Sequence, residues 1–363
     1  METHVQSVRV RPRPETDAPR SPVYDDVERL LVVRDDRLGD LVLTLPAIQC
    51  LRAAYPAATL ALLVQPSLAP LAELFDPVDR VLTVGRERAE TAATIREFAP
   101  DAAVCISRRA GAAWALRRAG VRRATGTARR WFSPLFDRTV DVSRRGSQQH
   151  ELEHALDLAC RAGALPGPVR FPLSIPAAAH TAAREWLRSR GIEQPPIVMH
   201  PGSGGSCPSW PAERWCALAR ELSSAGHPLV VSRGPSDEEV RAPFAGERFA
   251  DFDGGLVELA ALLGRARLVL SNSTGPIHLA AALDRPALAI HAPWRSCGAD
   301  RWGPWGERGR ALVVGDAAGW SRRRRRRHAT DLMRELGVPV VLREIESMLE
   351  NHPFDPAASG CTL

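Results

Sequence analysis

The stretch with the clearest potential for chemistry is Ser271-Asn272-Ser273-Thr274-Gly275-Pro276-Ile277-His278. It follows the apolar run Ala266–Leu270, which predicts a buried parallel strand, and precedes Leu279–Leu283, which predicts a helix. The polar residues therefore lie at a strand-to-helix turn, where Ser273 or Thr274 can cap the helix. Free backbone amides and the helix dipole favour an anion there, most simply a phosphate. A capped turn with no ligand explains this stretch equally well when it is taken alone.

A second polar turn, His200-Pro201-Gly202-Ser203-Gly204-Gly205-Ser206, follows the apolar run Pro196–His200, which predicts another strand. Its glycines leave backbone amides accessible, and such a concave turn can hold a phosphate. The same residue types also make ordinary turns. The turn is not a Walker loop, because it lacks Gly-Lys-Ser or Gly-Lys-Thr.

An acidic stretch, Gly234–Glu239, follows the next predicted strand. A carboxylate there can accept hydrogen bonds from ribose hydroxyls, as an acidic residue does in dinucleotide-binding folds. A solvated, acidic helix start explains this stretch equally well.

The first predicted strand, Arg29–Arg34, is followed by Asp35–Asp40 rather than by a GxGxxG turn. That difference argues against nicotinamide or flavin binding. Asp40 stands at the start of a predicted helix, where a carboxylate can act as a general base on a hydroxyl. Alternatively, Asp40 only favours the helix dipole, which contributes ~0.3–1 kcal/mol.

Arginines are the candidates for contact with anionic groups of an acceptor, because the chain contains no lysine. Arginine binds phosphate and carboxylate in a bidentate manner and is a poor proton-transfer base. The positions expected to contact an acceptor are Arg37, Arg129 and Arg130. Solvated surface charge is the alternative for the last two and for the basic run Arg322–Arg327.

Composition describes a water-soluble protein long enough for two domains, with 363 residues, 45% hydrophobic and 25% charged. No apolar run reaches the ~20 residues needed to span a membrane, and the polar, Arg- and Pro-rich start does not resemble a signal peptide. A cytoplasmic location is expected. The net charge of +6 suits an anionic ligand or membrane surface. The seven cysteines show no CxxC spacing, so neither a metal site nor a disulfide framework is predicted.

Short apolar strands alternate with helices in two halves, which predicts an α/β protein with parallel sheets covered on both faces. We expect a flexible extension over residues 1–26, a domain over 27–170, a second domain over 181–340, and a C-terminal helix and tail over 341–363. A proline-containing linker joins the domains. In such a pair, a ligand cleft lies at the carboxyl ends of the strands.

Four motifs stand in order across residues 29–350: Arg34–Asp40 with Thr44-Leu45-Pro46, His200–Gly204, Trp210-Pro211 with Trp215, and Ser271–Leu283. Together they resemble the ADP-heptose:lipopolysaccharide heptosyltransferases of glycosyltransferase family 9. The resemblance implies the GT-B fold, two Rossmann-like domains with parallel sheets facing across a cleft. It also implies an inverting, metal-independent transfer without a cofactor, in which Asp40 is the general base. The donor-binding positions that it indicates are Ser203, Gly204, Gly205, Glu238, Ser273, Thr274, Gly275 and His278. A structural role near the helix start is the alternative for His278.

Two positions depart from the family pattern. Pro208 stands where the family often has a lysine that reaches the leaving phosphate, and Ser273 stands where many members have aspartate. The charge of the diphosphate would then be met by backbone amides and an arginine such as Arg214 or Arg301.

The expected partners are a nucleotide-sugar donor and a glycolipid or saccharide acceptor, with peripheral contact at the inner face of the cytoplasmic membrane and no nucleic acid. Two alternatives keep the fold. One uses another nucleotide sugar with a natural-product or glycan acceptor, and the other is a non-catalytic protein that binds nucleotide sugar.

Overall fold

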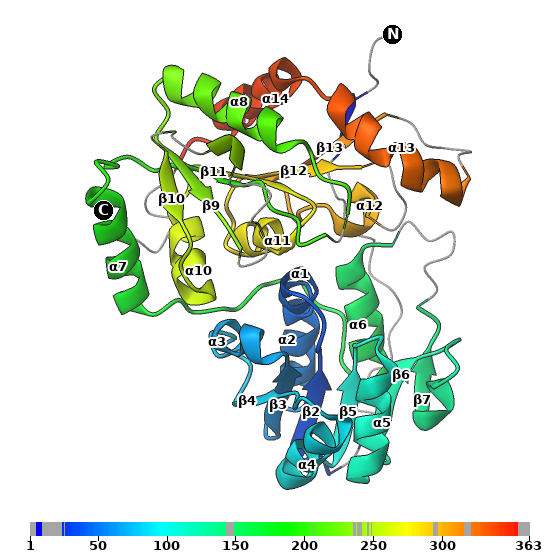
Figure 1. Ribbon diagram of the computed structural model, residues 1–363. Helices are drawn as coiled ribbons and strands as arrows, with labels where there is room; N and C mark the ends of the chain where they lie inside the picture. Colours follow the sequence, from blue (N-terminus) through cyan, green and yellow to red (C-terminus); the bar gives the residue numbers. More distant parts are fainter. Residues whose placement is uncertain are drawn as a thin grey trace. The chain divides into compact units, whose positions relative to one another are not determined.

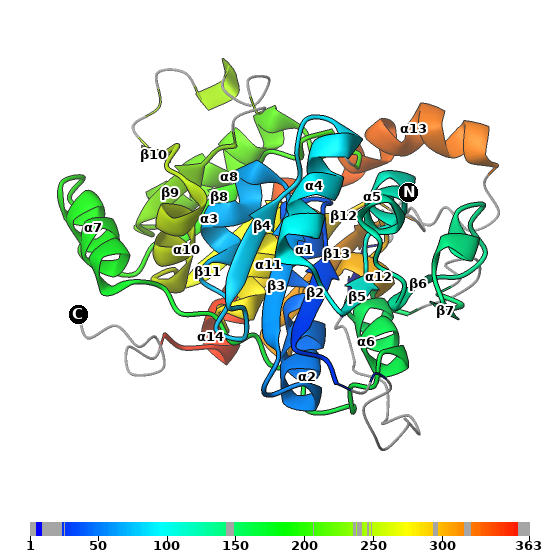
Figure 2. The same cartoon turned by 90° about the horizontal axis from the view of Figure 1, so that it is seen from below.

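The computed structural model describes residues 5–8, 24, 26–142, 149–205, 207–234, 237, 242–244, 247, 249–292, 297–315 and 321–354. The chain divides into two compact units (Figures 1 and 2). The N-terminal unit is Arg13–Ser174, and the C-terminal unit combines Ile175–Leu363 with Met1–Pro12. Glu238, one of the expected donor-binding residues, lies outside the described residues.

The N-terminal unit contains a parallel sheet with the strand order β4-β3-β2-β5-β6-β7. The order runs outward from β2 in one direction and then, from β5, in the other, as in a doubly wound Rossmann sheet. Its strands are β2 (Arg29–Val33), β3 (Thr59–Val64), β4 (Arg80–Thr83), β5 (Ala102–Cys105), β6 (Ala124–Thr127) and β7 (Arg138–Val140). Its helices are α1 (Leu38–Val42), α2 (Leu45–Ala54), α3 (Ala69–Ala72), α4 (Arg88–Phe98), α5 (Ala110–Ala119) and α6 (Glu151–Arg161).

The core of this sheet follows from the apolar content of its central strands. Four of the five residues of β2 are buried, because helices cover both faces of the sheet (Figure 1). On one face, Leu31 and Leu63 pack with Ile95 of α4 and Leu116 of α5. Burial of a leucine side chain contributes about 1.5–3 kcal/mol, so this packing fixes where the strands end and where the polar turns begin.

The C-terminal unit repeats the same winding, with the strand order β1-β13-β12-β11-β8-β9-β10. All neighbours are parallel except β1 and β13. Its strands are β1 (Val5–Val8), β8 (Ile197–His200), β9 (Leu229–Ser232), β10 (Ala250–Phe252), β11 (Leu268–Asn272), β12 (Ala287–His291) and β13 (Gly309–Val314). Its helices are α7 (Ala177–Arg188), α8 (Ala212–Ser224), α10 (Leu256–Gly264), α11 (Gly275–Ala282), α12 (Ala299–Trp302), α13 (Arg322–Glu335) and α14 (Val338–Asn351).

Within the expected extension over residues 1–26, the structure describes Val5–Val8, Tyr24 and Asp26. Val5–Val8 form β1, which pairs antiparallel with β13 from the register Val5↔Val314 onward. Tyr24 is buried, and its hydroxyl lies 2.9 Å from Oγ1 of Thr125. No apolar pattern predicted this strand, because an edge strand is held by backbone hydrogen bonds and needs no long apolar run.

The expectation that the cysteines form no disulfide is wrong. Cys207 and Cys297 form a disulfide across a sequence separation of 90 residues, with their Cα atoms 6.2 Å apart. They follow β8 and β12, the two neighbours of β11, so parallel winding brings their loops to the same edge of the sheet. Within the described residues, the cysteines that remain free are Cys50, Cys105, Cys160 and Cys216.

Replacing both bridged cysteines with serine is expected to lower the free energy of unfolding of the C-terminal unit by about 2–4 kcal/mol, because the crosslink restricts the unfolded chain. Urea unfolding without reductant measures the change, and wild-type protein in dithiothreitol should match the double variant. The half-buried free thiol of Cys160 provides the control substitution Cys160→Ser. An unchanged unfolding midpoint in the double variant would contradict this role of the disulfide.

Candidate functional site

The two units each place polar turns at the point where the strand order reverses. In the C-terminal unit that point lies between β8 and β11, whose last residues include the paired positions His200 and Ser271. In the N-terminal unit it lies between β2 and β5. Ligands of doubly wound sheets bind outside the carboxyl ends of the strands at such points. The turns chosen from the sequence therefore occupy the expected ligand positions of their sheets.

The turn after β11 presents the start of α11 without a side-chain cap. Thr274 is the N-cap residue, but its side chain makes no capping hydrogen bond. Instead, its Oγ1 lies 2.6 Å from Oγ of Ser271. Capping by the Thr274 side chain, expected from the sequence, is therefore wrong. The amides of the first turn of α11 donate no hydrogen bond to this side chain and are suited to an anion.

The turn after β8 contains two glycines in the left-handed region, Gly204 with φ 53° and Gly205 with φ 69°. A Cβ atom at either position would meet nothing within 4 Å, so both glycines border open space. The amide of Gly205 donates to Oγ of Ser203 (3.3 Å). This turn therefore leaves backbone accessible on its outer side.

Gly202, in the same turn, has a different role. A Cβ atom there would collide with the carboxylate of Asp237, so the backbone of the turn lies directly against that side chain. The Asp237 carboxylate accepts from the amide of Gly234 (2.7 Å) and lies 3.6 Å from Nε2 of His200. Asp237 therefore stabilises the turn through these contacts. From the sequence alone, this role could not be distinguished from hydrogen bonding to ribose hydroxyls.

His200 itself is a buried link between strands. Its Nδ1 lies 3.1 Å from Oγ of Ser232 at the end of β9. Burial lowers the pKa of His200 from its usual value, against the opposing influence of Asp237. The neutral ring is favoured, which fits a structural rather than an acid-base role.

Asn272 connects three of the sequence motifs and was not singled out from the sequence. Its Oδ1 accepts from the amide of Trp210 (3.0 Å), and its Nδ2 donates to the carbonyl of Pro201 (2.6 Å). The side chain is 1% exposed. The Trp210 ring in turn donates from Nε1 to the carbonyl of Leu336 (3.0 Å) and packs edge-on to Trp215. Asn272 therefore fixes the relative positions of the turns after β8 and β11.

The other donor-side residues differ in exposure. Ser203, Ser273, Thr274 and Gly275 are partly exposed, whereas His278 is buried. The His278 ring centroid lies 6.1 Å from that of Trp302. Trp302 also carries the guanidinium of Arg301 over its ring at 4.9 Å. Of the two arginines considered for the diphosphate, Arg301 is the one linked by packing to α11.

In the N-terminal unit, Asp40 lies on α1 and is held by a buried arginine. Arg34 donates from Nη2 to Oδ1 of Asp40 and from Nη1 to the carbonyl of Ile106 (2.9 Å). The Asp40 side chain is 16% exposed. Within the described part of the chain, its Oδ2 has no hydrogen-bond partner. One carboxylate oxygen is therefore fixed while the other is available.

Arg34 is surrounded by three carboxylates. Besides Asp40, its guanidinium lies 3.5 Å from Oδ2 of Asp36 and 3.5 Å from Oε1 of Glu151. Burial alone would lower the pKa of Arg34, but Asp40, Asp36 and Glu151 together raise it above its usual value. Burial also raises the pKa of Asp36, although Arg34 and Arg109 oppose the change. Glu151 lies at the start of α6, far away in the sequence, and no local pattern identified it.

The arginines expected to contact an acceptor are exposed. Arg37 is the N-cap residue of α1. Arg129, with φ 58°, forms an ion pair with Asp141 at 2.6 Å, and Arg130 follows it. The next residue, Trp131, is 74% exposed, a feature that the sequence did not reveal. This loop follows β6 and so lies at the carboxyl edge of the same sheet as Asp40.

Among the described residues, no group of three or more His, Cys, Asp or Glu side chains is arranged to hold a metal ion. No helix in the described ranges has the length and apolar character to cross a membrane.

Comparison with known proteins gives a family match. The model of glycosyltransferase family 9 (heptosyltransferase) matches residues 89–330. Lipopolysaccharide heptosyltransferase 1 of Salmonella typhimurium is 27% identical over 289 residues, which cover 73% of this chain and 88% of that protein.

Solved structures show the same fold. A family 9 glycosyltransferase from Veillonella parvula aligns with a TM-score of 0.75 at 19% identity, covering 92% of this chain and 99% of that one. Escherichia coli ADP-heptose lps heptosyltransferase II aligns with a TM-score of 0.72 at 20% identity, covering 89% and 99%. The prediction of a GT-B fold built from two Rossmann-like domains with parallel sheets is confirmed.

Substituting Asn272 with leucine is expected to lower the free energy of unfolding by about 2–4 kcal/mol, because the Trp210 amide and the Pro201 carbonyl lose their partner. Chemical denaturation measures this change. Ser273→Ala, at the partly exposed next position, is the control and should stay within about 0.5 kcal/mol of wild type. Equal stability of the two variants would show that the Asn272 bridge does not hold the turns.

Proposed function

Because the chain belongs to glycosyltransferase family 9, we propose that it transfers a sugar, with a heptose from ADP-heptose as the first candidate, to a saccharide acceptor similar to the lipopolysaccharide core. We propose that the transfer inverts the anomeric centre and uses no metal ion. The observation that carries the proposal is Asp40, whose Oδ1 is fixed by Arg34 and whose Oδ2 is available.

The donor diphosphate is proposed to bind at the two turns joined by Asn272. The amides that begin α11, around Thr274 and Gly275, offer donors to an anion, and the turn at Gly204 and Gly205 leaves open space for the anion to approach. The proposed contacts also include Ser203, Ser273, His278 and Glu238. Fixed amides stabilise charge that develops on a leaving group without any reorganisation. Because the chain has no lysine, any permanently cationic side chain at the diphosphate is an arginine, and Arg301 is the candidate.

The proposed chemistry is a direct displacement. Oδ2 of Asp40 takes the proton from an acceptor hydroxyl, and the hydroxyl oxygen attacks the anomeric carbon in line. The bond from that carbon to the diphosphate oxygen breaks, and the nucleoside diphosphate leaves with the electron pair. The ion pair with Arg34 holds the Asp40 carboxylate in one orientation during this transfer.

A second candidate keeps the reaction and changes the donor. Ser273 and Pro208 lack the two charged groups that the family often places there, which favours a nucleotide sugar other than ADP-heptose as the alternative donor. The orientation of Asp40 by a buried arginine speaks against a protein that only binds nucleotide sugar, because binding does not require a positioned base.

The test of the function is turnover with ADP-heptose and with GDP-, UDP- and dTDP-sugars, using deacylated lipopolysaccharide core saccharides as acceptors. Nucleoside diphosphate release with ADP-heptose is the expected result. Turnover with another nucleotide sugar alone would favour the second candidate, and no turnover with any donor would contradict a catalytic role.

Asp40→Asn is expected to lower kcat by about 10²–10⁴-fold, because the amide cannot accept the hydroxyl proton. Thermal stabilisation by ADP should remain, since the proposed nucleotide contacts lie in the other unit. Asp76→Asn, at an exposed carboxylate of the same unit, is the matched control and should keep full activity. Wild-type kcat in Asp40→Asn would rule out Asp40 as the base.

Replacing Arg129 and Arg130 together with alanine is expected to raise the acceptor KM by roughly tenfold, equivalent to about 1.4 kcal/mol, with the donor KM unchanged. The reason is the loss of two guanidinium groups beside the exposed Trp131. Arg117→Ala with Arg118→Ala removes the same charge from an exposed part of α5 and serves as the control. Equal acceptor KM values for the two double variants would remove the loop from the acceptor site.

A further inference from the structure

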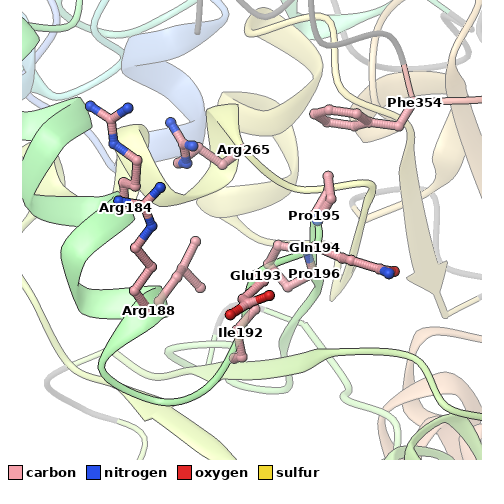
Figure 3. Close-up of a pocket in the computed structure, with 10 residues that line it drawn as sticks. Arg184, Arg188, Ile192, Glu193, Gln194, Pro195, Pro196, Arg265 and Phe354 are labelled. Atoms are coloured by element: carbon pink, nitrogen blue, oxygen red, sulfur yellow. The ribbon is translucent and has the colours of Figure 1, made fainter. Parts of the chain in front are cut away.

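A cavity of about 610 Å³ lies in the C-terminal unit, away from the polar turns (Figure 3). It is formed by the end of α7, the segment Ile192–Pro196 that leads into β8, the residue Arg265 that follows α10, and Phe354 after α14. Pro196 and Arg265 precede β8 and β11, so the cavity borders the amino ends of these strands. The proposed donor turns follow the carboxyl ends of the same strands, at the opposite edge of the sheet.

Three arginines line the cavity, and Figure 3 shows their guanidinium groups on the same side of it. Arg184 and Arg188 lie four residues apart on α7 and therefore on one face of the helix. Arg265 comes from the neighbouring α10 segment and is 8% exposed. Glu193 is the carboxylate of the lining and is exposed.

These positive charges are not neutralised within the described part of the chain. There, none of the three guanidinium groups forms an ion pair or a side-chain hydrogen bond. Glu193 is therefore not a partner of any of them. A buried charge without a partner is costly, so a site with a nine-tenths buried arginine is set up for an anion. The pKa of His180 is lowered by burial and by the charge of Arg265, which agrees with a positive potential at this place.

The cavity lining also has apolar members. Leu187 and Ile192 belong to it, and Figure 3 places the ring of Phe354 across the cavity from the three arginines. The guanidinium of Arg285 lies 5.8 Å from the centroid of that ring. A ligand that fills the cavity therefore needs an anionic end and an apolar or ring-shaped body. The volume falls in the range of about 300–1,000 Å³ that is typical of small-molecule sites.

We propose that this cavity is a second ligand site that binds a phosphate monoester with an apolar or aromatic body, with the phosphate on Arg184, Arg188 and Arg265 and the body against Phe354. Three guanidinium groups match the geometry and the double charge of a phosphate monoester. The site is separate from the donor turns and does not depend on the proposed transfer reaction. A soluble phosphate ester and a phospholipid headgroup share this chemistry.

The test is calorimetric titration of the full chain with phenyl phosphate at constant ionic strength, in the presence of saturating ADP so that the donor turns are occupied. Saturable binding is expected, weakened at least tenfold by Arg265→Gln. Arg188→Gln gives a second reading that does not depend on a buried position, because Arg188 is exposed. The controls Arg190→Gln and Arg343→Gln remove exposed charges outside the cavity lining and should leave binding unchanged.

Phe354→Ala separates the two halves of the site. It should weaken phenyl phosphate severalfold while leaving the weaker binding of inorganic phosphate unchanged. Sedimentation with phosphatidic acid vesicles, compared with phosphatidylcholine vesicles, distinguishes the two ligand sources. Binding of wild type to phosphatidic acid vesicles that is lost in Arg265→Gln identifies a lipid headgroup. No binding of wild type to these vesicles, or equal binding of the two proteins, identifies a soluble ester. Equal phenyl phosphate affinity in wild type, Arg188→Gln and Arg265→Gln overturns the proposal, as does complete displacement of phenyl phosphate by ADP.

Discussion

The proposed donor site depends on the two hydrogen bonds made by the side-chain amide of Asn272. This side chain sits at the end of β11, inside the C-terminal sheet, and spans from the Pro201 carbonyl to the Trp210 amide. Both ends of the amide are satisfied in a fully buried place, where an unpaired group would cost about 1–3 kcal/mol. Through Trp210, the same link reaches the Leu336 carbonyl and so the segment that joins α13 to α14. The positions of the exposed turns are therefore set by the core rather than by the turns themselves.

The N-terminal unit orients its candidate base in a different way. There the link is a buried cation, Arg34, that contacts Asp36, Asp40 and Glu151. A charged network is suited to orienting a carboxylate, because Arg34 keeps its own proton while holding one oxygen of Asp40. A neutral amide is suited to the donor side, because it positions backbone N–H groups without adding a charge that would compete with or repel a diphosphate. Loss of a carboxylate from the Arg34 cluster would leave a buried charge undercompensated, which is more costly than loss of an exposed pair.

Local patterns predicted the elements but not the links between them. The apolar runs of β2, β8 and β11 and the glycine- and serine-rich turns after them were readable, because burial and turn geometry act over a few residues. The disulfide between Cys207 and Cys297 and the contact of Glu151 with Arg34 were not, because strand order alone brings those residues together. Thr274 bonds Ser271 instead of capping α11, a choice between two local partners that composition does not decide. Similarly, β1 depends on an open edge of β13 that exists only after the sheet has formed.

The two departures from the family pattern, Pro208 and Ser273, offset each other in charge. A proline at position 208 removes a positive charge, and a serine at position 273 removes a negative one, so the local net charge is unchanged. A diphosphate would be repelled by a carboxylate at position 273 if the lysine were absent, and the serine avoids that repulsion. The features left for the proposed diphosphate are the start of α11 without a side-chain cap, the open glycine turn, and Arg301, whose guanidinium lies over the Trp302 ring beside His278. Binding in such a site would rely on oriented amides more than on flexible cations. Specificity for the donor would then depend on the turn geometry that Asn272 maintains.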